Sequence, residues 1–174
     1  PKIHEKDLSL LEAFKVPSFL FFLIVMCVCG SGDFFITTHL IPMVTDNNIS
    51  SVTAGNMLGL FGFMSFIGVL IVGPVIDLIG NKTPITITFM IRFILFLMIL
   101  KYQNLISFYI FALGFGFTFL ITVPPTPVLT GKICGFAHIG ILTGFINACH
   151  HLCGGLWAYV GGIIFDRTGS YDNI

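Results

Sequence analysis

Long runs of apolar residues alternate with short polar breaks along most of this chain. A helix needs about 20 residues to cross a bilayer, so runs of this length predict membrane-spanning helices. Five spans are expected, at residues 18–43, 53–76, 85–100, 105–127 and 139–165. The breaks between them read TDNNISS, DLIGNKTP, KYQN and VLTGKICGFAH. The pattern predicts an all-α membrane protein with five transmembrane helices, which together form the region 17–174.

Charged residues gather before the first span and in the breaks. Residues 1–16, PKIHEKDLSLLEAFKV, hold six of them and are predicted to be a polar lead-in outside the bilayer. Basic residues near helix ends favour the cytoplasm. A cytoplasmic N-terminus puts Lys82 and Lys132 on that side, and leaves Lys101 and Arg167 outside. The tail that follows the last span ends where a sixth helix could begin.

Composition supports the membrane assignment. Of the 174 residues, 56% are hydrophobic and only 9% are charged, whereas about a quarter of a soluble domain is charged. A net charge of zero gives no basic field for nucleic acid. The five cysteines lack the pattern of a disulfide framework and are predicted to be free. No G-x-x-x-x-G-K-[ST] motif is present, so ATP-driven pumping by this chain is not expected.

The break after the second span carries a recognisable motif. GPVIDLIGNK, residues 73–82, fits the pattern G-x-x-x-D-x-x-G-x-[RK], with Gly73, Asp77, Gly80 and Lys82 at the defining positions. It resembles the loop between the second and third helices of each half of major facilitator superfamily transporters. That resemblance implies a cytoplasmic conformational latch. The alternative is a turn whose charges sit at the membrane surface as gatekeepers.

Two further segments extend this resemblance to nearly the whole chain. Residues 39–55 and 143–171, the latter ending in D-x-T-G-S-Y, are similar to the monocarboxylate-porter and oxalate–formate-exchanger branch. The resemblance implies the C-terminal half-bundle, helices seven to eleven, after the end of the central cytoplasmic loop. Where many porters of this branch have an Asp–Arg pair in the eighth helix, this chain has Ser65 and Val69. Where exchangers use a lysine in the eleventh helix, it offers His150 and His151.

Two charged residues lie inside the predicted spans. Ionisable groups in a bilayer are costly and mark functional sites by default. Asp33 lies about 24 Å into its helix, with Thr37 on the same face, and is predicted to be a cavity residue that titrates or pairs with a cation. A structural hydrogen bond to another helix is the alternative. Arg92 is predicted to form a structural ion pair with Asp77; snorkelling and a solute-carboxylate contact are the alternatives.

The last span carries a polar stripe on one helical face. Its members are Thr143, Asn147, His150 and Gly154. His150 falls near mid-bilayer and is predicted to contact solute or proton, with inter-helix packing as the alternative; His151 points about 100° away. Cys149 and Cys153 flank the histidines, but packing is favoured over a metal site. In the fourth span, Thr118 and Thr122 precede VPPTP, which forms either a gate or a simple helix terminator.

These observations converge on a transporter rather than an enzyme. The predicted function is secondary active transport of a small organic anion by alternating access, coupled to protons or to exchange. The predicted solute or proton cavity comprises Asp33, Thr37, Thr118, Asn147, His150 and His151. The expected partners are a small solute, the lipid bilayer and the N-terminal half of the same transporter, with no cofactor, metal or nucleic acid, in a bacterial inner membrane. The alternatives are a membrane-embedded metal-dependent enzyme and a transport-inactive fragment.

Overall fold

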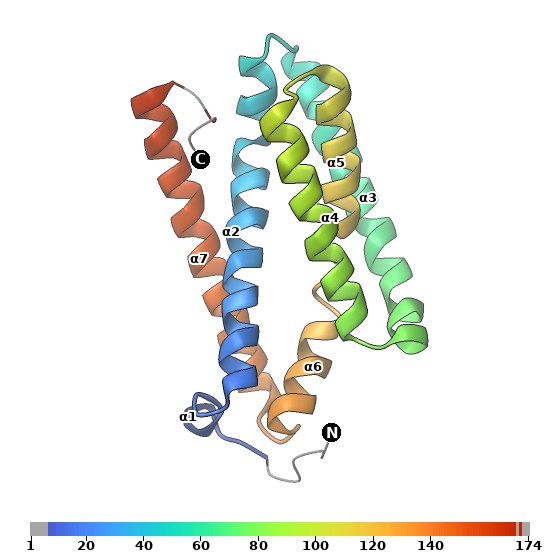
Figure 1. The fold of residues 1–174 in the computed structure, drawn as a ribbon, viewed down its shortest axis with the longest axis vertical. Helices are drawn as coiled ribbons and strands as arrows, with labels where there is room; N and C mark the ends of the chain where they lie inside the picture. The colour runs from blue at the N-terminus through green and yellow to red at the C-terminus, as the bar shows by residue number, and fades with distance from the viewer. Residues whose placement is uncertain (1–6, 170, 172–174) are drawn as a thin grey trace. The chain divides into compact units, whose positions relative to one another are not determined.

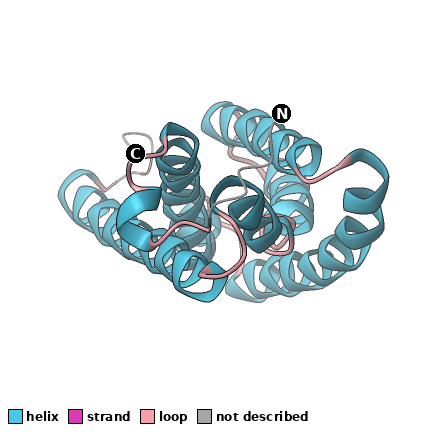
Figure 2. Ribbon diagram, turned by 90° about the horizontal axis from the view of Figure 1, so that it is seen from below, coloured by secondary structure: helices cyan, strands magenta, loops and turns pink. Residues whose placement is uncertain are grey.

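The computed structural model describes residues 7–169 and residue 171 (Figure 1). Within these residues the chain forms helices joined by short loops, and no strand is present (Figure 2). The helices are α1 (Leu10–Ala13), α2 (Pro17–Asp46), α3 (Ser51–Ile79), α4 (Lys82–Lys101), α5 (Leu105–Phe119), α6 (Pro125–Cys134) and α7 (Ile139–Thr168). The first six residues of the predicted lead-in lie outside the described residues. The all-α architecture expected from the apolar runs is confirmed.

Four of these helices, α2, α3, α4 and α7, are long and apolar enough to cross a membrane. The predicted fourth span, 105–127, is instead divided. Helix α5 ends at Phe119, residues 120–124 form turns, and α6 begins at Pro125. Pro124 disfavours a helical conformation at the residue before it, and Pro125 suits a first helical position. Most of the predicted break 128–138 is therefore helix, because α6 continues to Cys134.

Polar residues fix the ends of the apolar helices. Helix α3 begins after Ser50, whose hydroxyl accepts a hydrogen bond from the backbone N–H of Thr53 at 3.2 Å. Helix α5 begins after Asn104, whose side-chain oxygen accepts from the N–H of Ser107 at 3.0 Å. Such caps satisfy N–H groups that have no partner within the helix. The short TDNNISS and KYQN breaks therefore supply the residues that start the next helices.

The chain divides into two compact units. The first comprises residues 1–38 and 126–174, and the second comprises residues 39–125. The first 22 residues of α2 thus belong with α6 and α7, while α3, α4 and α5 belong to the second unit. Each unit has its own helix contacts, so each is described by itself.

In the first unit, α2 and α7 approach closely at two glycines. A Cβ on Gly30 would collide with the carbonyl oxygen of His150, and a Cβ on Gly154 would lie 2.7 Å from the carbonyl oxygen of Gly30. Small residues at such contacts let helix backbones come together inside a bilayer. At one end of the unit, Asp7 Oδ1 accepts from the N–H groups of Phe136 and Ala137 at 2.9 and 3.1 Å, which ties the lead-in to the α6–α7 connection.

In the second unit, α3, α4 and α5 run side by side. The rings of Phe61 on α3 and Phe115 on α5 stack at 6.2 Å, and Phe96 on α4 meets Phe115 edge-on at 5.6 Å. The Ser65 hydroxyl donates to the carbonyl oxygen of Gly116 at 3.0 Å. Aromatic packing joins α3, α4 and α5, and the Ser65 bond adds a polar contact between α3 and α5.

Candidate functional site

A polar cluster lies between α2 and α7 in the first unit. Asp33 on α2 is 3% exposed, and its Oδ2 lies 3.8 Å from Nε2 of His150 on α7. The Cys29 thiol, one helical turn before Asp33, donates to the same Oδ2 at 3.4 Å. The Nδ1 of His150 lies 3.1 Å from the carbonyl oxygen of Met26. Three different polar side chains thus converge on one point within two apolar helices.

The backbone contact of His150 fixes the orientation of its ring. A carbonyl oxygen can only accept a hydrogen bond, so Nδ1 carries a proton when it bonds Met26. The opposite nitrogen, Nε2, then faces the Asp33 carboxylate. The Phe34 ring packs edge-on against His150, with the ring centroids 6.2 Å apart. The imidazole is therefore held from two sides, with Nε2 directed at Asp33.

The spacing of residues along α2 creates this arrangement. Cys29 and Gly30 follow Met26 by three and four residues and precede Asp33 by four and three, so these residues share a face of the helix. Gly30 lets the α7 backbone approach that face at His150. A larger residue at Gly30 would push the helices apart and take Nε2 out of reach of Asp33. The polar cluster therefore depends on the glycine contact.

The other predicted cavity residues of the first unit lie outside this cluster. Thr37 is exposed, and its hydroxyl donates to the carbonyl oxygens of Asp33 and Phe34 on its own helix. Asn147 and His151 are exposed, and His151 Nδ1 bonds the backbone oxygen of Asn147 at 2.7 Å. The predicted stripe on α7 therefore contributes His150 and Gly154 to the contact with α2, while Asn147 faces outward.

Arg92 and Thr118 form a separate buried cluster in the second unit. Arg92 is 4% exposed, and its Nη2 donates to the carbonyl oxygens of Thr118 and Phe119 at 3.0 and 3.2 Å. Its guanidinium carbon lies 4.7 Å from the centroid of the Phe115 ring. Carbonyls at a helix C-terminus carry partial negative charge and have no partner within the helix. Arg92 thus caps the broken end of α5.

This contact corrects the predicted ion pair between Arg92 and Asp77. Among the described residues, Asp77 is exposed in the last turn of α3 and takes part in no ion pair. Arg92 is the eleventh residue of α4, so its backbone lies about 15 Å along the helix from Lys82. The carbonyls freed by the α5 break provide buried acceptors for it instead.

Comparison with known proteins agrees with this architecture. Residues 2–169 match the family described as Major Facilitator Superfamily. The chain belongs to the major facilitator superfamily. It is 30% identical over 149 residues to a protein of Bacillus subtilis (strain 168) named "Uncharacterized MFS-type transporter YcxA". That match covers 82% of this chain but 36% of the relative's length. The chain thus spans about a third of that relative's length, and its family and apolar helices indicate an integral membrane protein of a transporter family.

The superfamily motif occupies the tight connection between α3 and α4. Helix α3 ends at Ile79 and α4 starts at Lys82, so only Gly80 and Asn81 separate them. Gly80 has φ +81°, a backbone conformation that suits glycine, and its N–H donates to the carbonyl oxygen of Ile76 at 2.9 Å. Asp77 and Lys82 are exposed on either side of this turn. Glycine is therefore favoured at position 80 of the motif because the turn requires a positive φ there.

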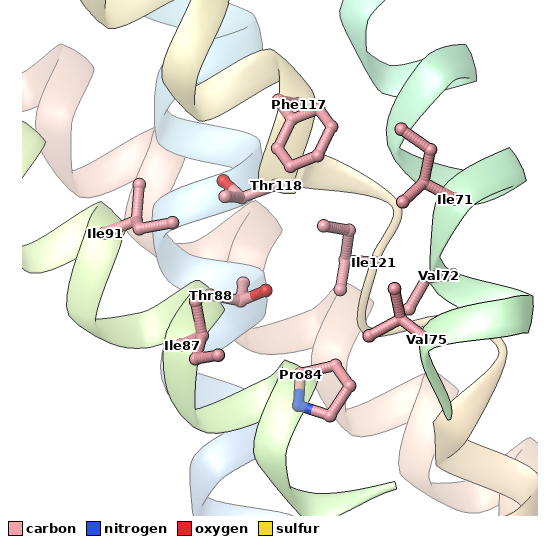
Figure 3. Close-up of a pocket in the computed structure, with 10 residues that line it drawn as sticks. All are labelled: Ile71, Val72, Val75, Pro84, Ile87, Thr88, Ile91, Phe117, Thr118 and Ile121. Atoms are coloured by element: carbon pink, nitrogen blue, oxygen red, sulfur yellow. The ribbon is translucent and has the colours of Figure 1, made fainter. Parts of the chain in front are cut away.

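A small cavity in the second unit is a poor candidate for a solute site. It has a volume of about 120 Å³ and lies between α3, α4 and the end of α5 (Figure 3). Its walls are aliphatic and aromatic except for Thr88 and Thr118, and no charged side chain lines it. The Asp33–His150 cluster is the better candidate, because it combines burial with ionisable groups.

Sequence reasoning missed Cys29 as a polar participant. All five cysteines are free, as expected, but none was expected to take part in a polar contact. The available signal was the spacing: Cys29 precedes Asp33 by four residues and therefore lies on the same helical face. The contact with His150 on α7 could not be read from that spacing, because it depends on how two distant helices pack.

Proposed function

We propose that the full-length protein is a secondary active transporter that moves a small organic anion by alternating access. It would belong to the branch of monocarboxylate porters and oxalate–formate exchangers, reside in a bacterial inner membrane, and place the start of this chain in the cytoplasm. The observation that carries the proposal is the Asp33–His150 contact at 3.8 Å between two apolar helices. Ionisable groups at such depth are retained for function rather than for packing.

The anion class rests on the resemblance and on the groups around the cluster. His150 offers an imidazole in the cluster, and the exposed His151 and Asn147 offer further imidazole and amide groups on α7. Arg92, a cation buried in the second unit, is occupied by the carbonyls at the end of α5. The N-terminal half of the transporter would therefore meet the negative charge of the solute. Either a proton gradient or exchange for a second anion would drive transport.

The α3–α4 turn would act as a conformational latch in this cycle. Gly80 gives a short, defined turn, and Asp77 and Lys82 are exposed beside it, where another segment of the transporter could engage them. Alternating access needs contacts that form on one side of the membrane in one state and break in the other. Because both charges are exposed, their replacement would change transport rates more than stability.

Uptake by full-length protein in liposomes tests the proposal. Oxalate, formate and lactate would be offered either with an inward proton gradient or to vesicles preloaded with the same anion. We expect one of these two conditions to drive uptake. Asp33→Asn should lower the uptake rate about tenfold or more, which corresponds to about 1.4 kcal/mol in free energy. Asp46→Asn is the matched control, because Asp46 is exposed at the end of the same helix. Equal rates for Asp33→Asn and the parent protein would contradict the assignment of the site.

A further inference from the structure

The geometry points to a site for a divalent transition-metal cation of the Zn²⁺ class, formed by Cys29, Asp33 and His150. One ligand atom from each residue, the Sγ, a carboxylate oxygen and an imidazole nitrogen, lies within 4.8 Å of the other two. Cys29 and Asp33 are buried, and the His150 side chain is 14% exposed. This inference is independent of the transported solute.

The spacing of the three atoms suits one ion. Bonds of about 2.0 to 2.3 Å in a tetrahedral zinc site place neighbouring ligand atoms about 3.3 to 3.6 Å apart. The Cys29 Sγ and Asp33 Oδ2 already lie 3.4 Å apart. The His150 Nε2 is 3.8 Å from the same Oδ2, and the imidazole nitrogen and the Cys29 sulfur lie within 4.8 Å of each other. Binding one ion therefore needs side-chain rotations that bring the sulfur and the nitrogen closer by up to about 1 Å.

The orientation of His150 is the second independent feature of the site. A metal-binding histidine usually donates its other ring N–H to a carbonyl or carboxylate, which fixes the tautomer and directs the free lone pair at the ion. Here Nδ1 bonds the Met26 carbonyl at 3.1 Å, and Nε2 is directed at Asp33. The backbone oxygen of Met26 thus supplies the support that such a ligand needs.

The charges and ligand types favour zinc-like ions. When the ion binds, the Cys29 proton, now donated to Asp33, is released to water, and the thiolate and carboxylate together balance the two charges of the cation. A neutral assembly is favoured among apolar helices, where a net charge is costly. Thiolate and imidazole ligands select Zn²⁺ and similar ions over Mg²⁺ and Ca²⁺, which prefer oxygen. Three protein ligands leave a fourth position open for water or a solute.

Cobalt binding to the purified full-length protein tests the site. Co²⁺ alone is the probe, because a thiolate ligand gives it a near-ultraviolet charge-transfer band and tetrahedral geometry gives visible bands. We expect saturable binding of one Co²⁺ by the parent protein and its displacement by Zn²⁺. Cys29→Ser should abolish the charge-transfer band, and Asp33→Asn and His150→Gln should each weaken binding about tenfold or more.

Cys27→Ser is the matched control. Cys27 lies two residues earlier on α2 and faces Cys153 rather than the cluster, so this variant should bind Co²⁺ as the parent does. The inference is overturned if the parent protein binds no Co²⁺, or if the charge-transfer band survives Cys29→Ser. Binding without uptake would contradict the proposed function alone, and uptake without binding would contradict the metal site alone.

Discussion

In both units, glycines let neighbouring helices pack closely, but the side chains around the two contacts differ. The α2–α7 contact and the α3–α5 contact both place glycines where backbones approach, at Gly30 and Gly154 in the first and at Gly116 in the second. In the first, an acid and an imidazole face each other across the contact. In the second, the surrounding side chains are mainly phenylalanines, and a serine hydroxyl provides the inter-helix bond.

The two units also differ in the groups that surround their buried ionisable side chains. Arg92 is surrounded by carbonyl oxygens and the Phe115 ring, so its charge is fully engaged by fixed groups of the second unit. Asp33 instead shares one carboxylate oxygen with Cys29 and His150, two groups that could both bind a single ion. The first arrangement stabilises a helix break, whereas the second is the proposed place for a ligand.

The largest expected loss of stability comes from a substitution that removes the Arg92 contacts. Arg92→Met removes the donors to the carbonyls at the end of α5 and leaves those buried acceptors unpaired. We expect it to lower the free energy of unfolding of the full-length protein by about 3 kcal/mol, measured by denaturant titration in mixed micelles. Asp33→Asn should cost less than about 1 kcal/mol, because its shape is kept. A larger loss of stability for Asp33→Asn than for Arg92→Met would reverse the comparison.

The next largest effect is a difference in stability between substitutions at two adjacent glycines of α7. A Cβ on Gly154 would lie 2.5 Å from the Phe34 ring and 2.7 Å from the Gly30 carbonyl oxygen, whereas a Cβ on Gly155 meets nothing within 4 Å. Gly154→Ala should therefore destabilise the protein by about 2 kcal/mol through overpacking. Gly155→Ala should raise the stability by up to about 1 kcal/mol through helix propensity.

The thermal unfolding midpoints of these two glycine variants give the measurement. Because both substitutions add the same methyl group to neighbouring positions of one helix, the difference between them isolates the α2–α7 contact. Midpoints that shift by the same amount in the same direction would show that the contact does not constrain α7.

Apolar periodicity predicted the helices, but it could not predict their partners. The run at 18–43 corresponds to α2, which extends to Asp46 because the polar residues after the run still continue the helix. The helix break within 105–127 is caused by prolines that are visible in the sequence. The sequence did not reveal that Arg92 would bond the carbonyls at this break. The acceptors of Arg92 are backbone carbonyls, which have no signature in the sequence. Asp33 and His150 were each identified, whereas their contact depends on tertiary packing.

A smaller loss of stability is expected when the hydrogen bond between α3 and α5 in the second unit is removed. The Ser65 hydroxyl donates to the Gly116 carbonyl oxygen on α5 as well as to Phe61 on its own helix. Ser65→Ala should cost about 1 kcal/mol of unfolding free energy. Ser31→Ala is the control, because the Ser31 hydroxyl donates to Cys27 within α2. Equal losses for the two variants would show that the bond to Gly116 contributes nothing.

The smallest effect concerns the lead-in of the first unit. The Leu8 N–H donates to the Cys134 carbonyl oxygen at 2.8 Å, next to the two bonds accepted by Asp7, and the Cys134 side chain is fully buried. Burial raises the pKa of the Cys134 thiol above its ordinary value. The thiol is therefore neutral at pH 7, and its modification by a maleimide, which needs the thiolate, should be slow and should accelerate as the pH rises.

Asp7→Ala removes the acceptor of both N–H groups and should loosen the lead-in by less than about 1 kcal/mol. Cys134 would then be modified about two- to fivefold faster at pH 7, in proportion to the more frequent opening. Peptide mass spectrometry of the full-length protein follows this site separately from the other cysteines. Asp7→Asn keeps the side-chain oxygen and should restore slow modification. If Asp7→Ala leaves the rate unchanged, the lead-in does not cover Cys134, and the first unit is held together by its glycine contact and polar cluster without this tie.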